Sequence, residues 1–450
     1  MKTKIIILIT ILLPLAAFSQ IEGYWKGTLD LGPQQLELGF DIKNGDSLNT
    51  TLDVPAQGAY GIPAQSVING QSITISVSSI GARYQGTING KTMTGTFSQR
   101  GVDFPLDLTK SEKQLAKKIR PQDPKEPFDY IVEEVSFENK TDGITLAGTL
   151  TMPKGKGPFP AVVLVSGSGA QNRDEELMEH KPFLVIADYL TRNGIAVLRY
   201  DDRGVAQSEG DASTATTADL ANDAQAAFNY LLGREETDHD NIGIIGHSEG
   251  GMINFMVAAR EQKVAFIISL AGPALKGSEI LKQQQNDILK AQGFSNEAIA
   301  FSTSTNNRLI DIVEETKETD SIYPRIEHVL KEMGLNEETI RQTTETLLSP
   351  WMVYFIKHDP TDDIVATQCP ALLLNGTKDL QVSATQNLAA FKKIAKQHHK
   401  KNLVVCKMKG LNHLFQHCKN GLPTEYIEIE ETIAPEALEK IRKFVMKNGR

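Results

Sequence analysis

Residues 241–251 read Asn-Ile-Gly-Ile-Ile-Gly-His-Ser-Glu-Gly-Gly, and this stretch decides the fold. The apolar run Ile242–Ile245 predicts a short buried strand, and the pattern from Gly251 to Arg260 predicts a helix. Between them Ser248 stands at a sharp turn, with a glycine two residues before it and another two residues after it. Glycine removes the side chains that would clash in such a turn. The pattern predicts a serine hydroxyl raised above a sheet, at a helix N-terminus that favours negative charge.

The region around this turn alternates between apolar strand runs and helical patterns. Near-continuous apolar runs are typical of parallel strands that are covered on both faces. The predicted strands are Ala161–Val165, Ala196–Tyr200, Ile242–Ile245, Ala265–Leu270, Ala371–Leu374 and Leu403–Met408. Their alternation with helices predicts right-handed crossovers and a doubly wound, mostly parallel α/β sheet. Ligands bind such sheets beyond the C-terminal ends of the strands, and Ser248 follows such an end.

The alternation stops between Lys276 and Pro360, where the sequence is polar, prone to form helices and free of strand patterns. Because this stretch separates two predicted strands, it must be an insertion at one end of the sheet. We interpret residues 276–360 as a helical lid; a lateral packing module or an oligomer contact is the alternative. Five apolar residues here are candidates either for facing a ligand or for the core of the lid: Phe301, Ile310, Trp351, Tyr354 and Phe355.

The N-terminal part of the chain has a different pattern. Residues 20–110 alternate polar and apolar side chains in short runs, with Asn-Gly turns that are typical of hairpins. They predict a small all-β domain, either a barrel or a sandwich. Residues 111–127 are charged and contain three prolines, which indicates a linker. The α/β domain is predicted to span residues 128–450.

The first nineteen residues read as a secretory signal. Lys2 and Lys4 precede the apolar run Ile5–Ala17, and small residues follow where a signal peptidase would cut. The apolar run is too short for a stable membrane span. The expected location of the protein is therefore periplasmic or extracellular. In such a compartment Cys406 and Cys418 could form a disulfide, and free or buried thiols are the alternative.

A serine hydroxyl is a weak nucleophile that needs a base, and the base needs an acceptor to orient it. Asp379 follows the strand Ala371–Leu374, and His413 follows the strand Leu403–Met408 in a short loop. The order Ser248, Asp379, His413 predicts a catalytic triad at one edge of the sheet. Asp379 could instead cap the next helix, and His417 is the substitute base if His413 fails.

An acyl-transfer site also needs hydrogen-bond donors for the oxyanion. The main-chain N–H of Glu249, the residue after the serine, is the first expected donor. The second is expected in the loop Ser166–Gln171 after the strand Ala161–Val165, where Ser168 N–H is preferred to Gly169 N–H.

Taken together, these motifs resemble the α/β-hydrolase family, over about residues 128–450. They are Ser-Gly-Ser-Gly at 166–169, Asp-Arg-Gly at 202–204, Gly-His-Ser-Glu-Gly-Gly at 246–251, Gly-Thr-Lys-Asp at 376–379 and Asn-His at 412–413. Within that family the chain looks most like secreted bacterial serine esterases of the group related to dienelactone hydrolases and prolyl oligopeptidases. It lacks the His-Gly-Gly-Gly oxyanion motif of some lipases. The resemblance implies no cofactor, and no metal site is expected.

The expected activity is that of a secreted serine hydrolase that cleaves carboxylic esters through an acyl-enzyme. An amidase, a peptidase or a thioesterase with the same triad is the enzymatic alternative, and a binding protein on an inactive hydrolase scaffold is the other. The partner is expected to be a small ester or acyl compound. The net charge of −9 argues against nucleic acid. The sequence leaves the oligomeric state open.

Overall fold

The structure is a computed structural model that describes residues 21–31, 35–43, 49–55, 59–99, 102–112, 120–317 and 321–448. The chain divides into two compact units, residues 1–116 and residues 117–450. The expected signal segment, residues 1–19, lies outside the described residues.

The first unit is a closed barrel in which every strand pairs with the next one along the chain. The pairing of β1 with β8 closes it, and all neighbouring strands are antiparallel. Trp25, Phe40 and Tyr84 are completely buried and fill the interior. The predicted all-β domain is confirmed, as a barrel. Its strands are β1 (Gly23–Asp30), β2 (Gln35–Lys43), β3 (Asn49–Val54), β4 (Ala59–Asn69), β5 (Ser72–Val77), β6 (Ala82–Asn89), β7 (Thr92–Gln99) and β8 (Val102–Ser111).

The second unit is built on an eight-stranded sheet with the order β16-β15-β14-β13-β11-β12-β10-β9. Only β10 runs against its neighbours, β9 and β12, and the other adjacent pairs are parallel. The doubly wound, mostly parallel sheet is thus confirmed. Its strands are β9 (Ile131–Asn139), β10 (Ile144–Met152), β11 (Phe159–Val165), β12 (Ala196–Tyr200), β13 (Thr237–His247), β14 (Phe266–Leu270), β15 (Ala371–Gly376) and β16 (Leu403–Met408).

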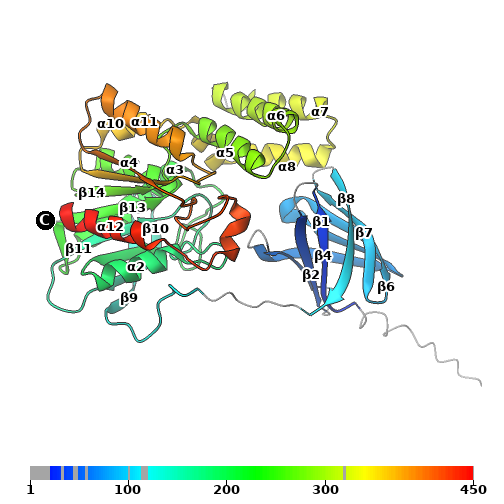
Figure 1. The fold of residues 1–450 in the computed structure, drawn as a ribbon, viewed down its shortest axis with the longest axis horizontal. Coiled ribbons are helices and arrows are strands. Elements are labelled where there is room, and N and C mark those ends of the chain that lie inside the picture. Colours follow the sequence, from blue (N-terminus) through cyan, green and yellow to red (C-terminus); the bar gives the residue numbers. More distant parts are fainter. Residues whose placement is uncertain are drawn as a thin grey trace, which may run out of the picture. The chain divides into compact units, whose positions relative to one another are not determined.

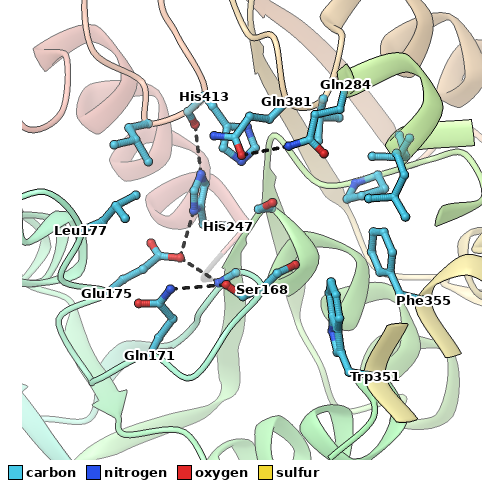
Figure 2. A pocket seen from close by; sticks show the side chains of 17 residues that line it. Ser168, Gln171, Glu175, Leu177, His247, Gln284, Trp351, Phe355, Gln381 and His413 are labelled. Atoms are coloured by element: carbon cyan, nitrogen blue, oxygen red, sulfur yellow. Dashed lines mark hydrogen bonds and ion pairs between the residues drawn. The ribbon is translucent and has the colours of Figure 1, made fainter. Parts of the chain in front are cut away.

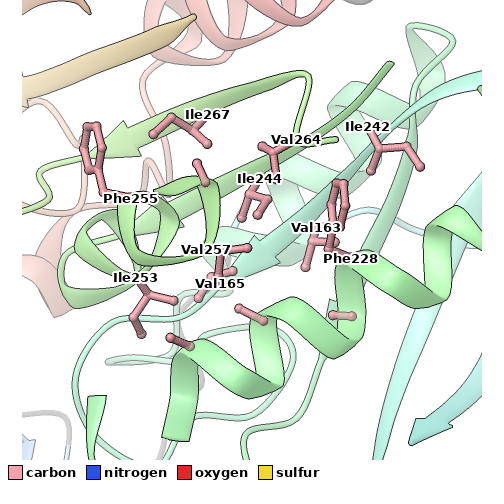
Figure 3. Packing of buried hydrophobic residues seen from close by; sticks show 14 of the residues in the cluster. Val163, Val165, Phe228, Ile242, Ile244, Ile253, Phe255, Val257, Val264 and Ile267 are labelled. Atoms are coloured by element: carbon pink, nitrogen blue, oxygen red, sulfur yellow. The ribbon is translucent and has the colours of Figure 1, made fainter. Parts of the chain in front are cut away.

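Helices cover both faces of this sheet (Figure 1). Val163 and Val165 of β11 pack into the core beneath α3 and α4, as Figure 3 shows. The intervening residues Val162 and Leu164 point to the opposite face and pack with α2 and α12. This two-residue period explains why a strand buried on both sides is apolar throughout. The covering helices are α2 (Pro182–Arg192), α3 (Thr217–Leu232), α4 (Glu249–Arg260), α10 (Thr361–Ala366), α11 (Ala384–Gln397) and α12 (Pro435–Asn448).

Of the six helices that the structure describes between β14 and β15, the first five form the insertion, which we call the lid. It has its own apolar core, contributed by α6, α7, α8 and α9, in which Ile310, Ile326 and Ile356 are buried. The next helix, α10, no longer belongs to it, because its Ile364 packs in the core of the sheet. The lid helices are α5 (Gly277–Ala291), α6 (Asn296–Glu315), α7 (Ile322–Glu332), α8 (Glu337–Leu347) and α9 (Pro350–Lys357). Across the described residues, no helix combines the length and the apolar character that a membrane span requires.

Candidate active site

Ser248 occupies the sharp turn that the sequence predicts. It follows β13 directly and precedes the first residue of α4, and its backbone has a positive φ, with φ 52° and ψ −121°. The neighbouring glycines are needed for close approach. A Cβ atom on Gly246 would lie 2.1 Å from the carbonyl oxygen of Gly250, and one on Gly250 would lie 2.2 Å from that of Val165. The turn therefore holds the serine hydroxyl in one place above the sheet.

The structure brings Asp379 and His413 together at the same edge of the sheet. Nδ1 of His413 is 2.9 Å from Oδ2 of Asp379, and the two side chains are 5% and 0% exposed. The other carboxylate oxygen accepts the main-chain N–H groups of Gln381 and Val382, each at 2.9 Å. These contacts fix the carboxylate from both sides, so the bond to Nδ1 orients the imidazole and leaves Nε2 for other partners.

Ser248 and His413 both line a pocket of about 300 Å³. The lid contributes one wall, where the rings of Trp351 and Phe355 stack with centroids 5.2 Å apart. Figure 2 shows this aromatic pair across the pocket from Glu175. The remaining lining is mostly apolar or amide-bearing: Gln171, Leu177, Pro273, Ile280, Leu281, Gln284, Gln381, Val382 and Leu414.

The two expected oxyanion donors belong to segments that meet at Ser248. Glu249 is the first residue of α4, and first-turn N–H groups have no acceptor within their helix. Ser168 lines the pocket in the loop after β11. Its neighbour Gly167 is unsuitable, because its N–H already donates to Oε1 of Glu175 at 2.8 Å. The N–H groups of Glu249 and Ser168 therefore stay the predicted donors, with that of Gly169 as the alternative to Ser168.

The loop that carries Ser168 is braced by buried acids. Asp202 accepts the Ser166 hydroxyl at 2.7 Å and the Gln171 main-chain N–H at 2.9 Å. Burial raises the pKa of Asp202 to about 8, although these two hydrogen bonds oppose the rise. Nearby, Arg173 pairs with Asp201 at 2.7 Å. These contacts tie the Ser168 loop to the end of β12.

The carboxylate of Glu249 forms a second buried cluster. It accepts the Thr217 hydroxyl at 2.6 Å and the indole N–H of Trp351, which is 2.9 Å from each oxygen. Burial raises the pKa of this carboxyl, while Thr217, Ser168 and Trp351 partly offset the rise. The residue next to the serine thus connects the lid to α3 and α4, which its sequence position alone does not reveal.

His247 and Glu175 are a further buried pair that the sequence did not single out as functional. Nδ1 of His247 is 2.9 Å from Oε1 of Glu175, and Nε2 is 3.0 Å from the main-chain oxygen of His413. Glu175 lies in a loop with no periodic pattern, so only its acidic type could have marked it. His417, the substitute base, is half exposed and bonds to Glu431 and Glu436 instead.

No metal-binding cluster of His, Cys, Asp or Glu side chains occurs within the described ranges. The three cysteines, Cys369, Cys406 and Cys418, are free thiols. The described lining of the pocket presents the hydroxyl of Ser248, the imidazoles of His247 and His413 and the carboxylate of Glu175.

Comparison with known proteins identifies relatives of this chain. The profile of the family described as X-Pro dipeptidyl-peptidase (S15 family) matches residues 142–418. Esterase EstD of Thermotoga maritima is 28% identical over 321 residues, which cover 71% of this chain and 70% of that protein. An uncharacterized 31.7 kDa protein of Escherichia coli is 24% identical over 268 residues, covering 58% of this chain and 86% of that protein. The structure of an esterase from Pyrococcus furiosus aligns with a TM-score of 0.46 and 13% identity, over 71% of this chain and 92% of that one.

The family profile spans β10 to the loop after His413, and so includes Ser248, Asp379 and the lid. The residues that gather around the pocket all fall within this match. The chain belongs to the X-Pro dipeptidyl-peptidase (S15) family, and it is a serine hydrolase with the α/β-hydrolase fold.

Proposed function

We propose that the protein is an exported carboxylesterase that uses Ser248, His413 and Asp379 as a catalytic triad. The observation that carries the proposal is the juxtaposition of the three residues, each of which follows a different strand of one sheet. Ser248 attacks the ester carbonyl while Nε2 of His413 takes the hydroxyl proton. Asp379 keeps the other ring nitrogen protonated and stabilises the imidazolium that forms.

The rest of the reaction follows from the same groups. The N–H groups of Glu249 and Ser168 stabilise the tetrahedral oxyanion. When the intermediate collapses, the C–O bond to the alcohol breaks and His413 returns its proton to the leaving oxygen. Water then attacks the acyl-enzyme by the same route, which releases the carboxylic acid and restores Ser248. The reaction needs no cofactor.

Esters are favoured over the dipeptidyl substrates in the family's description because of the charge in the pocket. A dipeptidyl peptidase must bind the ammonium group of its substrate, which is best paired with a carboxylate. Glu175 is the sole carboxylate among the described lining residues, and its charge is already paired with the ring of His247 at 2.9 Å. The apolar and amide lining suits an uncharged acyl group. The name of esterase EstD agrees with this choice.

Substitution of Ser248 by alanine tests the nucleophile. The Ser248→Ala protein is expected to lose about 10⁴- to 10⁶-fold in kcat on p-nitrophenyl acetate, because the covalent route is closed. The exposed Ser213, replaced in the same way, serves as the matched control and should leave kcat unchanged. Turnover by Ser248→Ala close to that of wild type would show that the nucleophile is misassigned.

Two further measurements separate the alternatives. A fluorophosphonate probe should label wild-type protein but not Ser248→Ala, and an unlabelled wild type would favour a binding protein on an inactive scaffold. Parallel assays with p-nitrophenyl esters, thioesters and aminoacyl-prolyl-p-nitroanilides rank the possible substrates. A kcat/KM for the anilide above that for the ester would favour the peptidase.

Export is the part of the proposal that rests on residues 1–19. Their charged start, apolar run and small residues are the pattern of a cleaved signal. Cell fractionation with N-terminal sequencing tests it, and a mature chain that begins at Gln20 is expected. A cytoplasmic protein that retains Met1 would contradict export without affecting the triad.

A further inference from the structure

The pair formed by Glu175 and His247 has no role in the mechanism above, yet it lies against the site. Its side chains are 6% and 9% exposed. Glu175 has left-handed backbone geometry, with φ 50°, in the loop that precedes α2. A buried charge in this backbone conformation lowers the stability of the folded protein through strain and desolvation, unless hydrogen bonds and ion pairs offset both.

The contacts determine the protonation state of His247. One ring nitrogen faces the Glu175 carboxylate and the other faces the main-chain carbonyl of His413. Both partners are acceptors, so both nitrogens must carry a proton for both bonds to form. Burial lowers the pKa of His247, but Glu175, the carbonyl of His413 and the charge of Asp379 outweigh burial and raise it overall. The geometry therefore points to a buried imidazolium.

This imidazolium links two catalytic segments. Through Nε2 it holds the main chain at His413, the residue whose ring must stay between Asp379 and Ser248. On the other side of the pair, Oε1 of Glu175 also accepts the N–H of Gly167, next to the expected oxyanion donor Ser168. Figure 2 shows the chain of contacts from Glu175 through His247 to His413.

We propose that Glu175 and His247 are a positioning pair, in which the imidazolium of His247 holds the main chain of His413 and Glu175 neutralises it. The inference rests on the proposed function, since it assigns His413 as the base. Neither side chain reacts with the substrate. The pair sets the distance between the base and Ser248 and, through Gly167, the place of the oxyanion loop.

Glu175 has a second, electrostatic consequence. The rings of His247 and His413 are only 4.8 Å apart, and His413 must take up a proton during each turnover. A second positive charge at that distance would oppose protonation of the base. Because Glu175 cancels the charge of His247, the site gains a double hydrogen-bond donor without this repulsion. A neutral histidine could donate only one of the two bonds.

The kinetic test uses His247→Gln. The glutamine side chain carries no charge, and its NH₂ group can donate to only one of the two acceptors. We expect kcat for p-nitrophenyl acetate to fall about 10- to 100-fold with KM changed less than about threefold, because the base is misplaced while the lid wall of the pocket is unchanged. Glu175→Gln should lower kcat in the same range. A kcat within twofold of wild type in both variants would overturn the proposal.

His417→Gln is the matched control. His417 also bonds to carboxylates through both ring nitrogens and lies in the same loop as His413, but it is 54% exposed and does not hold the His413 carbonyl. Its kcat should equal that of wild type. An equal fall in all three variants would indicate a general loosening of the loop and would contradict a specific role for His247.

A spectroscopic readout is independent of turnover. In wild-type protein with ¹⁵N-labelled histidine, the signal that disappears in His247→Gln should have two protonated ring nitrogens at pH 7.5. In Glu175→Gln the same signal should become that of a neutral ring. A neutral His247 in the wild type would overturn the inference, whatever the activity. If the wild type shows a charged His247 but neither hydrolyses esters nor binds the fluorophosphonate, the proposed function fails while the buried pair stands.

Discussion

Ser248 and its partners show how single residues are constrained. A non-glycine residue with φ 52° carries backbone strain of about 1–3 kcal/mol, so the surroundings must hold it there. The main-chain N–H of Ser248 donates to the carbonyl of Leu270 at 2.8 Å, and Gly251 N–H donates to the carbonyl of Ser248 at 2.9 Å. The main chain on both sides of the turn is thus fixed before any substrate binds.

The same reasoning gives a prediction for Asp379→Asn. The wild-type carboxylate accepts four hydrogen bonds, from His413, Asn375, Gln381 and Val382. An amide in its place has one oxygen, so its NH₂ group must face either the ring of His413 or the N–H groups of the turn. We expect the imidazole to take the wrong tautomer and kcat to fall about 10³- to 10⁴-fold with little change in KM. Steady-state kinetics checks this, and activity within tenfold of wild type would mean that Asp379 does not orient the base.

At the scale of elements, the strand pattern was sufficient to predict the sheet. The runs Ala196–Tyr200 and Leu403–Met408 are strands with the predicted bounds, because each is mostly apolar and a polar residue, Asp201 or Lys409, follows its last residue. The run Ile242–Ile245 is only the buried middle of β13, whose polar first residues pair at the edge of the core and carry no apolar signal. The all-β domain was recognisable because its strands alternate polar and apolar side chains and are separated by Asn-Gly turns.

The lid was predictable as an insertion but not in detail. Its helices have several amphipathic faces, and sequence does not tell which face meets the sheet and which meets another lid helix. Of the five candidates, Trp351 and Phe355 line the pocket, Ile310 is buried in the lid core, and Phe301 is 75% exposed. The Glu249–Trp351 contact joins residues 102 positions apart, and no local pattern encodes it.

Trp351→Phe tests how the lid is anchored. The substitution keeps a stacking ring but removes the N–H from the buried Glu249 carboxylate, a hydrogen bond worth about 1.5–3 kcal/mol when one partner is charged. The pKa of Glu249 is already raised above its ordinary value of 4.5. Protonation of this buried carboxyl therefore favours the folded state at low pH, and this stabilisation is lost as the pH rises. Losing a donor raises this pKa further. The variant should therefore lose more unfolding free energy at pH 8 than at pH 5, as urea titration can measure.

Phe355→Leu is the matched control for the lid. It disrupts the aromatic stack at the same wall of the pocket but leaves the N–H of Trp351 on Glu249. Both variants should raise KM for aryl esters, since both alter the wall. Only Trp351→Phe should change the pH dependence of stability, and an equal pH dependence in the two variants would rule out the Glu249 contact as an anchor.

At the scale of the whole molecule, the second half of the predicted linker, from Arg120 onward, is part of the hydrolase fold. Arg120 lies in the stretch predicted as a linker, but its guanidinium donates to four main-chain carbonyls, those of Met178, Glu179, Ile427 and Ile429. Gln122 adds three bonds to the segment before α12. Composition could not reveal this, because a charged, proline-containing stretch looks the same whether its side chains bind water or main-chain carbonyls.

These contacts predict where the hydrolase unit can be cut. A fragment of residues 117–450 keeps Arg120 and should fold and hydrolyse p-nitrophenyl acetate with kcat within twofold of the full chain. A fragment of residues 128–450 leaves the four carbonyls without their buried donor, and should lose about 3 kcal/mol or more of unfolding free energy. Arg120→Met in the full chain should produce a similar loss of unfolding free energy. This variant separates the effect of the Arg120 side chain from the effect of the truncation.

Because Arg120 joins the Glu175 loop to the segment that follows His413, the shorter fragment should also have a lower kcat. Equal stability and activity in the two fragments would show that the hydrolase unit begins after residue 127 and that the linker only connects the units.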